Sequence, residues 1–217
     1  MDFQRLYATR FAEEDLPAKG NIWKVICAEF LSRFVPRNGT VVDIGAGYCE
    51  FINNIECGRK IAIDLNPDVK RFANSDVEVI NESCLAVESL ADNSVDVVFV
   101  SNFLEHLLNK QQVFDTLRES RRILKTGGKL LILQPNIRFL PGNYWDFFDH
   151  HTPLSDRCLV EALGALEMKI VKSYPRFLPY TTKSKLPKRS IFVKMYLRIP
   201  WIWPVFGKQA FIVAEKR

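Results

Sequence analysis

The amino-acid sequence predicts an α/β fold, in which a seven-stranded, mostly parallel sheet carries helices on both faces. Short apolar segments rich in valine and isoleucine alternate along the chain with segments whose apolar residues recur at helical spacing. The short segments are apolar at nearly every position, as is typical of strands covered on both faces. The first of them ends at a Gly-x-Gly turn, a feature of many open parallel sheets.

Length and composition are those of one globular domain. The chain has 217 residues, of which 47% are hydrophobic and 25% charged, so a full core can form. Its five cysteines are an odd number without a Cys-x-x-Cys pair, which argues against structural disulfides and a zinc site. The N-terminus lacks a signal-peptide pattern, and the longest uncharged apolar stretch, residues 199–207, is far shorter than the roughly 20 residues of a membrane-spanning helix. We therefore expect a cytoplasmic protein.

The chain begins with a predicted helical region. Apolar residues follow helical spacing over residues 21–34 and give this helix one buried face. Pro36 and Gly39 end it. The mixed, polar residues 1–20 predict a short helix and loop, so we expect residues 1–36 to form a helical lid.

Strands and helices then alternate. The predicted strands are residues 40–44, 60–65, 77–80, 95–100, 129–133, 169–174 and 210–214. The predicted helices between them are residues 49–55, 68–73, 105–124 and 154–166, with a loop or short helix at 85–90. The sequence Thr126-Gly127-Gly128 ends the longest helix. The last two strands are joined by a long basic insertion, which predicts an antiparallel pair at the sheet edge.

The turn after the first strand, within the sequence VVDIGAGYCE at residues 41–50, is the most informative segment for function. Gly45 and Gly47 permit a tight turn and let the backbone approach a ligand without a Cβ clash. Asp64 ends the next strand, 19 residues after Gly45, where a carboxylate commonly accepts both ribose hydroxyls. A Gly-x-Gly turn alone can bind nothing, but Asp43 before it and Asp64 after it favour a nucleoside site.

Two cofactor classes fit this turn. In the dinucleotide pattern Gly-x-Gly-x-x-Gly the third glycine would stand at Glu50, whose carboxylate would repel a pyrophosphate. The chain also lacks the Tyr-x-x-x-Lys sequence that short-chain dehydrogenases use. S-adenosyl-L-methionine has no phosphate and carries a sulfonium cation, which suits an acidic pocket. The residues therefore favour S-adenosylmethionine, with an NAD-dependent oxidoreductase as the rival interpretation.

Four segments between residues 41 and 136 stand in a familiar order and spacing: VVDIGAGYCEF, IAIDLNPD, ADNSVDVVFVSNFLEHL and LRESRRILKTGGKLLILQPN. They resemble the motifs of class I S-adenosylmethionine-dependent methyltransferases, and more narrowly those of the small-molecule branch. The resemblance implies a Rossmann-like seven-stranded sheet with an antiparallel edge pair. It also implies S-adenosylmethionine as the cofactor and in-line methyl transfer, which leaves S-adenosylhomocysteine.

The same resemblance implies which residues border the cofactor. They are Asp43, Gly45, Ala46 and Gly47 at the methionine part, Asp64 at the ribose, Leu65 and Asn66 beside the adenine, and Ser101 and Asn102 facing the sulfonium and the substrate. The chain departs from the family pattern at two places. Ser83 or Cys84 stands where an acidic residue often lies near the adenine, and Cys49 replaces a frequent third glycine of the first motif.

The acceptor side is predicted from the histidines of the chain, which follow the fourth and fifth strands: His106, His150 and His151. Transfer to an oxygen requires a base, and histidine serves near neutral pH. Each also has a structural interpretation, as a helix residue paired with a neighbour such as Glu105 or as part of the turn before Thr152. Asp149 is placed to orient the imidazole of His150 or His151. No group of carboxylates, histidines or cysteines has metal-ligand spacing, so no metal is expected.

The second half of the chain carries a looser resemblance. The segments DFFDHHTPLSDRCLVEALGAL, YPRFLPYTTKSKLP and YLRIPWIWPVFGKQAF are similar to methyltransferases of bacterial surface-polysaccharide gene clusters. This similarity implies an acceptor oxygen on a small molecule or a glycan. Tyr144 and Trp145 either stack on such an acceptor or pack in the core.

Positive charge is concentrated near the C-terminus. Residues 168–214 hold ten Lys or Arg and no Asp or Glu, whereas residues 1–167 hold 18 basic and 24 acidic groups. Basic and aromatic side chains mix within residues 176–208, which fits a solvated face over core aromatics, an interfacial helix on an anionic membrane, or a nucleic-acid surface. The fourth strand ends in Ser-Asn-Phe-Leu rather than Asn-Pro-Pro-Tyr, which disfavours nucleic acid.

We expect a single methyltransferase domain over residues 1–217. After the lid, residues 37–136 form the cofactor-binding core, and residues 137–217 form the acceptor side with the basic insertion at 175–208. The predicted function is methyl transfer from S-adenosylmethionine to an oxygen of a small molecule or glycan. The rival from another class is a catalytically silent binding protein that keeps the fold and acts through its basic segment.

Overall fold

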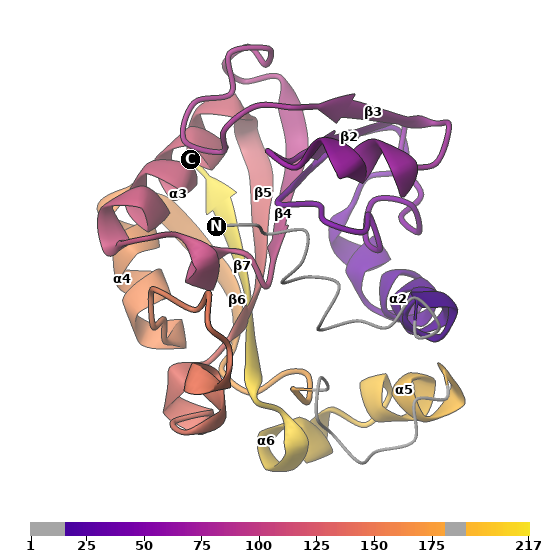
Figure 1. Ribbon diagram of the computed structural model, residues 1–217, viewed down its shortest axis with the longest axis vertical. Helices are drawn as coiled ribbons and strands as arrows, with labels where there is room; N and C mark the ends of the chain where they lie inside the picture. The colour runs from indigo at the N-terminus through magenta and orange to yellow at the C-terminus, as the bar shows by residue number, and fades with distance from the viewer. Residues whose placement is uncertain (1–15, 181–189) are drawn as a thin grey trace.

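The computed structural model is built around one seven-stranded sheet (Figure 1). The strands, in chain order, are β1 (Thr40–Ile44), β2 (Arg59–Ile63), β3 (Val77–Ile80), β4 (Val95–Ser101), β5 (Leu124–Pro135), β6 (Met168–Tyr174) and β7 (Gln209–Lys216). Their spatial order is β3-β2-β1-β4-β5-β7-β6. β7 runs antiparallel to β5 and β6, and the other neighbouring pairs are parallel. The predicted mostly parallel sheet with an antiparallel edge pair is confirmed.

The structure describes residues 16–180 and 190–217. Residues 1–15, which were predicted as part of the helical lid, lie outside the described residues. So do residues 181–189 of the predicted basic insertion, with Lys183, Lys185, Lys188 and Arg189. Within the described ranges, no helix combines the length and apolar character that crossing a bilayer requires.

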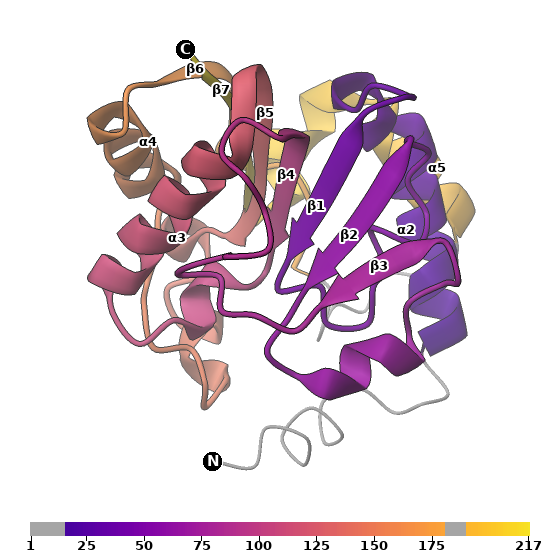
Figure 2. The same ribbon diagram turned by 90° about the horizontal axis from the view of Figure 1, so that it is seen from above.

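Two helical layers cover the sheet (Figure 2). α3 (Lys110–Ile123) and α4 (Asp156–Ala165) lie on one face, and α2 (Leu16–Glu29), α5 (Ser190–Leu197) and the short α6 (Trp203–Phe206) lie on the other. Alternate residues of each strand enter the two cores: Val42 and Ile44 of β1 belong to the core under α3 and α4, and Val41 belongs to the core under α2. Because both faces are buried, the central strands are apolar at nearly every position.

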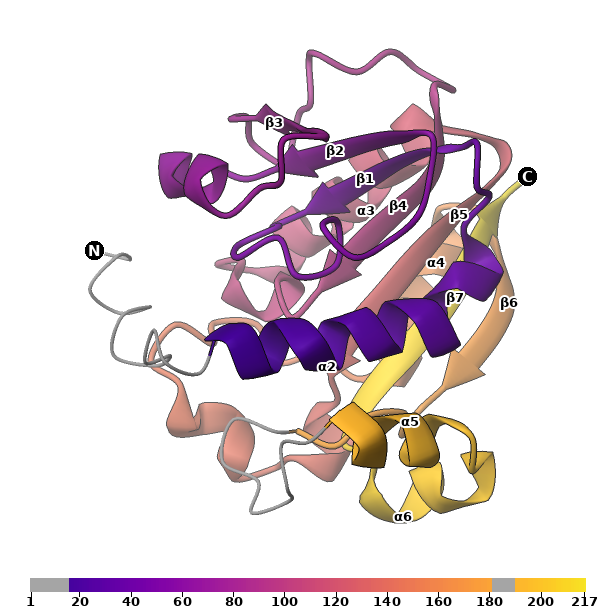
Figure 3. The same cartoon turned by 90° about the vertical axis from the view of Figure 1, so that its right-hand side faces the viewer.

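The N-terminal helix and the C-terminal insertion form one layer, as Figure 3 shows. Glu29 of α2 pairs with Lys194 of α5 at 2.7 Å and with Arg198 at 3.0 Å. Phe30, directly after α2, is surrounded by aromatic rings with centroids 4.4–6.2 Å away, on Phe34, Tyr174, Phe177, Trp203 and Phe211. Some of the aromatic residues of the insertion are therefore part of the core.

Short 3₁₀ helices connect the regular elements: η2 (Leu31–Phe34), η3 (Pro67–Arg71), η4 (Leu104–His106), η5 (Ile137–Phe139), η6 (Asn143–Asp146) and η8 (Pro200–Ile202). The helix predicted at residues 105–124 is divided between η4 and α3. Asn109 accepts a hydrogen bond from Gln112 N at 3.0 Å, and such an N-cap starts a new helix. The helix predicted at residues 68–73 is the single 3₁₀ segment η3, and residues 85–90 form turns.

Residues 49–55, predicted as a helix, form a series of turns instead. Asn54 Nδ2 donates to Glu50 O at 2.8 Å, and Asn53 Nδ2 donates to Phe72 O at 2.8 Å. Asparagine side chains compete with the helical backbone by making such bonds. The prediction was wrong here because the apolar spacing fits both a helix and a series of buried turns.

The order of the strands changes direction at β1, which lies between β2 and β4. Because these three strands are parallel, their carboxyl ends meet at one edge of the sheet. Open α/β sheets bind ligands at such a switch point. We therefore expect a ligand site among the loops that leave β1, β2 and β4.

Candidate active site

The turn after β1 contains two glycines with positive φ, +68° at Gly45 and +51° at Gly47. Gly45 N donates to Ile63 O at 2.9 Å, which joins the turn to the end of β2. A Cβ at Gly45 would lie 2.3 Å from the ring of Phe103, so this glycine lets the loop after β4 approach. A Cβ at Gly47 would meet no described atom within 4 Å. Gly45 therefore serves packing, whereas Gly47 borders open space that a ligand can fill.

Cys49 stands at the position of the third glycine and has a backbone typical of glycine, with φ at +59°. Its side chain is fully buried, with Sγ 3.9 Å from Val69 O. A side chain in the left-handed region costs roughly 1–2 kcal/mol. Cys49 thus replaces the glycine of the family motif, but its backbone still takes the left-handed conformation that suits glycine. The sequence around Cys49 carries no signal for that conformation.

Asp64, directly after β2, joins two turns. Its Oδ2 accepts a hydrogen bond from Gly47 N at 2.9 Å, and its Oδ1 accepts one from Asn66 N at 2.8 Å. A carboxylate has about four lone-pair sites, so this one keeps acceptor capacity for ligand hydroxyls. Leu65 beside it is 67% exposed and offers an apolar surface. Asn66 Oδ1 accepts from Asp68 N at 3.0 Å and caps η3, so its side-chain oxygen is already engaged.

Negative charge is concentrated at this edge of the sheet. Asp43 is buried, and its burial, together with the charges of Glu50 and Asp64, raises its pKa well above the usual range. Glu50 pairs with Lys19 of α2 at 2.6 Å. Ala46 lies between the two glycines and is buried. Carboxylates gathered in this way favour a cationic ligand and disfavour a phosphate.

The structure separates two residues predicted beside the adenine. Cys84 is buried in the core, with Sγ 3.4 Å from Thr116 Oγ1. Ser83 is half-buried, and its Oγ accepts from Leu85 N at 3.2 Å. The side chain of Cys84 thus packs away from the surface, and only its backbone and Ser83 remain for a ligand.

Ser101 and Asn102 lie at the carboxyl end of β4, beside the end of β1. Asn102 has a positive φ of +47°, and its N donates to Leu133 O at 2.9 Å. Its Nδ2 donates to Ser101 Oγ at 3.0 Å. A strained backbone held by such contacts is common at functional sites. The structure places both residues at the sheet edge where β1 ends, and their contact with the cofactor stays a prediction.

His106 in η4 is paired with Asp149 across 43 residues of chain. His106 Nδ1 lies 3.1 Å from both Oδ2 and the backbone O of Asp149. Since these oxygens can only accept, Nδ1 donates and the neutral ring keeps its lone pair on Nε2. Burial alone would lower the pKa of His106, but the bond to Asp149 and the charge of Glu105 outweigh it and raise the pKa. The expected partner was a sequence neighbour, whereas the structure provides a distant buried carboxylate.

The other two histidines differ in their surroundings. His150 is buried, its ring stacks on Phe147 at 4.8 Å, and it lies 5.1 Å from the ring of His106. The side chain of His151 is exposed, and its N donates to Glu105 O at 2.9 Å. The structure thus brings His106 and His150 together and leaves the ring of His151 at the surface.

The two aromatic residues of η6 also differ. Tyr144 is fully buried, and its hydroxyl donates to Thr152 O. Burial raises the pKa of this hydroxyl. Trp145 is exposed, so its ring remains available for a flat ligand. Core packing therefore accounts for Tyr144 and not for Trp145.

Residues 42–132 match the family model described as methyltransferase domain. Over these residues the chain is similar to a methyltransferase domain, which is consistent with the class I methyltransferase that the sequence motifs predicted. The matched range runs from β1 into β5 and includes the turn at Gly45, Asp64 and the end of β4. The domain implies S-adenosylmethionine as its cofactor, as predicted from the acidic turn. No curated protein matches the chain.

Solved structures share the fold of this methyltransferase domain over almost the whole chain. A SAM-dependent methyltransferase from Archaeoglobus fulgidus is 23% identical, with 99% of this chain and 100% of the other covered and a TM-score of 0.67. A chain from a Haloferax volcanii complex of the Trm112 methyltransferase activator with a methyltransferase is 18% identical, with 96% of each covered and a TM-score of 0.68. A SAM-dependent methyltransferase from Thermotoga maritima is 16% identical, with 97% and 98% covered and a TM-score of 0.65.

Proposed function

We propose that the protein transfers a methyl group from S-adenosylmethionine to an oxygen of a small molecule or glycan. The observation that carries this proposal is the pair of His106 and Asp149 beside the glycine turn. The ring of Phe103 packs against Gly45, and His106 N donates to Phe103 O at 3.0 Å. The backbone of His106 is thus joined to the residue that packs against the turn, and the proposal places its imidazole beside a cofactor bound there.

The cofactor contacts that we propose follow from the geometry of the turns. Gly45, Ala46 and Gly47 line the methionine part, and its ammonium and sulfonium charges would favour the ionised form of the buried Asp43. Asp64 accepts the ribose hydroxyls with its remaining lone pairs. Leu65, Asn66, Ser83 and the backbone of Cys84 border the adenine, and Ser101 and Asn102 face the sulfonium.

The bound cofactor supplies an electrophilic methyl group on sulfur. His106 Nε2 accepts the proton of the acceptor hydroxyl as its oxygen attacks the methyl carbon. Asp149 keeps the other proton on Nδ1 and stabilises the imidazolium that results. His150 lies against this ring, Trp145 stacks on the acceptor, and His151 borders the entrance.

Calorimetric titration with S-adenosylmethionine, S-adenosylhomocysteine and NADH tests the cofactor site. We expect the first two to bind and NADH to fail, because the acidic turn repels phosphate. Asp64→Ala should weaken binding by about 1–3 kcal/mol, since the ribose hydroxyls lose their acceptor. Glu78→Ala removes an exposed carboxylate from β3 and serves as the matched control. Binding of NADH alone would support the oxidoreductase interpretation instead.

A transfer assay with methyl-labelled S-adenosylmethionine and bacterial glycan and small-molecule extracts tests the acceptor chemistry. The label is expected in methyl ethers that survive alkaline hydrolysis. His106→Ala and His106→Gln should each lower the transfer rate about 10²–10⁴-fold, while calorimetry shows unchanged cofactor binding. Label on nitrogen or carbon, or full activity of both variants, would contradict oxygen transfer with His106 as base. Cofactor binding without any transfer would favour the silent binding protein.

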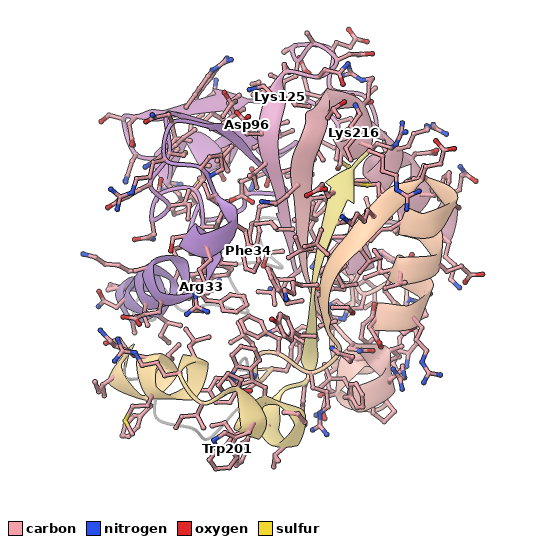
Figure 4. All side chains as sticks on the ribbon, turned by 180° about the vertical axis from the view of Figure 1, so that it is seen from behind. Arg33, Phe34, Asp96, Lys125, Trp201 and Lys216 are labelled. Carbon is pink, nitrogen blue, oxygen red and sulfur yellow. The ribbon has the colours of Figure 1, made fainter. Side chains whose placement is uncertain are left out.

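We also propose that the insertion contacts an anionic membrane. Of the eleven exposed large apolar side chains among the described residues, six belong to this segment: Ile191, Phe192, Met195, Trp201, Val205 and Phe206. Trp201 is 79% exposed and lies at the outer edge of the molecule, near α6 (Figure 4). Apolar side chains in a segment with eight basic and no acidic residues suit an interfacial position on anionic lipid. Such a position suits a lipid-linked glycan acceptor.

Co-sedimentation with vesicles tests the membrane contact. The chain should pellet with phosphatidylcholine vesicles that contain phosphatidylglycerol and less with phosphatidylcholine alone. Trp201→Ser combined with Phe206→Ser should release it, whereas Leu108→Ser, which changes an exposed apolar side chain elsewhere, should not. Equal pelleting of all variants would remove the support for this contact.

A further inference from the structure

Glu105, His106 and His150 form a group at the carboxyl end of β4 that the mechanism above uses only in part. One carboxylate oxygen and one nitrogen from each ring lie within 4.8 Å of one another. Glu105 and His150 are 1% and 6% exposed, whereas the His106 side chain is 18% exposed, so the group is buried but reachable from one side. Linear spacing had predicted no metal site, because 44 residues separate the two histidines.

We propose that Glu105, His106 and His150 bind one divalent transition-metal ion, Zn²⁺ or Mn²⁺, and leave open positions for an oxygen of the methyl acceptor. Two imidazoles and one carboxylate are a set of ligands that such ions accept while keeping other positions free. Mg²⁺ and Ca²⁺ prefer sites made of oxygen alone, so the two imidazoles select against them.

The surroundings of these ligands match those of a metal site. Asp149 holds His106 Nδ1 at 3.1 Å, which leaves Nε2 as the nitrogen for the ion. Gln134 Nε2 donates to Glu105 Oε2 at 2.8 Å and orients the carboxylate. Ligands of metal ions are commonly held by carboxylates and amides in this way. Gln134 Oε1 is buried without a hydrogen-bond partner among the described residues, and an ion-coordinated water would supply a donor.

Charge balance points the same way. Glu105 and Asp149 are both buried carboxylates, and a buried carboxylate is unfavourable unless a positive charge lies nearby. A protonated His106 compensates one of them, and a divalent ion compensates both. Bonds of about 2.1 Å place neighbouring ligand atoms about 3.0–3.4 Å apart, so the side chains must move inward by about 1 Å. Side-chain rotation is sufficient for a movement of this size.

This inference rests on the proposed function, because it concerns how the same site activates the acceptor. An ion at this position lowers the pKa of a hydroxyl that coordinates it. The proton then leaves to solvent, the oxygen–carbon bond forms, and the carbon–sulfur bond breaks. In the ion-loaded protein His106 acts as a ligand, and it serves as base only without the ion.

Metal titration of the untagged, chelator-treated chain tests the proposal. Co²⁺ is followed by its visible absorption, and Zn²⁺ and Mn²⁺ are followed by calorimetry. We expect one ion per chain, and about 100-fold excess Mg²⁺ should not displace it. A wild-type chain that binds no ion, or binds Mg²⁺ equally well, would overturn the proposal.

Variants assign the ligands. His150→Ala and Glu105→Gln should each weaken binding at least about 10-fold, and Asp149→Asn, which acts through His106, by about 10–100-fold. His151→Ala removes the adjacent but exposed imidazole and should bind the ion like the wild type. Calorimetry with S-adenosylmethionine checks that each variant is folded. If His151→Ala weakened binding as much as His150→Ala, the assignment would be wrong.

Different results would contradict the metal site and the methyl-transfer function. Methyl transfer that needs added Mn²⁺ or Zn²⁺ after chelation supports the ion. Undiminished transfer after chelation, without Co²⁺ binding, overturns the metal site and leaves His106 as the base. Failure to bind S-adenosylmethionine overturns the proposed function whatever the metal titration shows.

Discussion

Adding one methyl group at Gly45 tests what the first glycine of the turn is for. The sequence pattern suggests that a larger residue here, as in Gly45→Val, would block the cofactor directly. In the structure the nearest obstacle is Phe103, whose Cδ2, Cγ and Cβ would lie 2.3, 2.4 and 2.9 Å from the added Cβ. Since His106 follows three residues later, Gly45→Ala should displace the acceptor side of the site as well as strain the turn.

Two contributions determine how much Gly45→Ala lowers the free energy of unfolding. The φ of +68° is unfavourable for alanine by roughly 1–2 kcal/mol. Displacing Phe103 resembles overpacking of a core, which costs about 1–3 kcal/mol. Gly45→Ala should therefore lower the free energy of unfolding by about 2–5 kcal/mol. Gly47→Ala, with open space around its Cβ, should lower it only by the roughly 1–2 kcal/mol of the backbone term.

Urea unfolding followed by circular dichroism measures both effects. Gly45→Ala combined with Phe103→Ala removes the two ring contacts and leaves only the contact with the Cβ of residue 103 at 2.9 Å. The destabilisation should therefore be smaller than the sum of the single variants by about 1–3 kcal/mol. Gly47→Ala should stay folded but lose affinity for S-adenosylmethionine in calorimetry. Additive effects of Gly45 and Phe103, or a larger destabilisation at Gly47 than at Gly45, would refute the reasoning.

Three further predictions concern other positions. Cys49→Gly should be more stable than Cys49→Ala by about 1 kcal/mol in urea unfolding, because the backbone is left-handed and both variants lose the same sulfur; the reverse order would contradict the φ of this residue. Burial, and then the charges of Glu50 and Asp64, raise the pKa of Asp43, so the folded state binds the Asp43 proton more tightly than the unfolded chain does. The protonated Asp43 therefore contributes fully to stability below about pH 3.9, and this contribution is lost as the pH rises through the raised pKa. Asp43→Asn should therefore raise the melting temperature of the ligand-free protein more at pH 8 than at pH 4, and an equal rise at both would exclude this explanation. Lys216 lies at the end of β7 (Figure 4), and its Nζ donates to Asn93 Oδ1 at 2.9 Å and to Leu124 O at 2.7 Å. Lys216→Met should therefore lower the free energy of unfolding, measured in urea, by about 1–3 kcal/mol. Arg217→Met serves as the control and should leave it unchanged.

The strands were predictable because their signal is local. A buried strand such as β1 or β4 is a short run of β-branched residues, and its ends are marked by glycine or polar residues within the same run. The turns at residues 49–55 were not predictable in this way. Their hydrogen bonds to Phe72 and Glu50 come from asparagine side chains, and apolar spacing carries no information about those partners.

For the same reason, the sequence predicted the cofactor side of the candidate site better than the acceptor side. The cofactor side is built from turns that directly follow β1, β2 and β4, so motif order alone placed Gly45, Asp64 and Asn102 at one sheet edge. The acceptor side depends on contacts between η4 and the loop after η6. Neither the pairing of His106 with Asp149 nor the approach of His150 follows from spacing along the chain.

The sequence by itself therefore determined the α/β architecture, the acidic glycine turn and the class of cofactor, because each depends on residues that are adjacent or one strand apart. Only the tertiary structure decided which histidines meet, that Tyr144 belongs to the core while Trp145 is exposed, and that Gly45 makes room for Phe103. Burial and contact between distant segments depend on how the helical layers pack on the sheet. That packing is a property of the whole chain, and no local window of residues contains it.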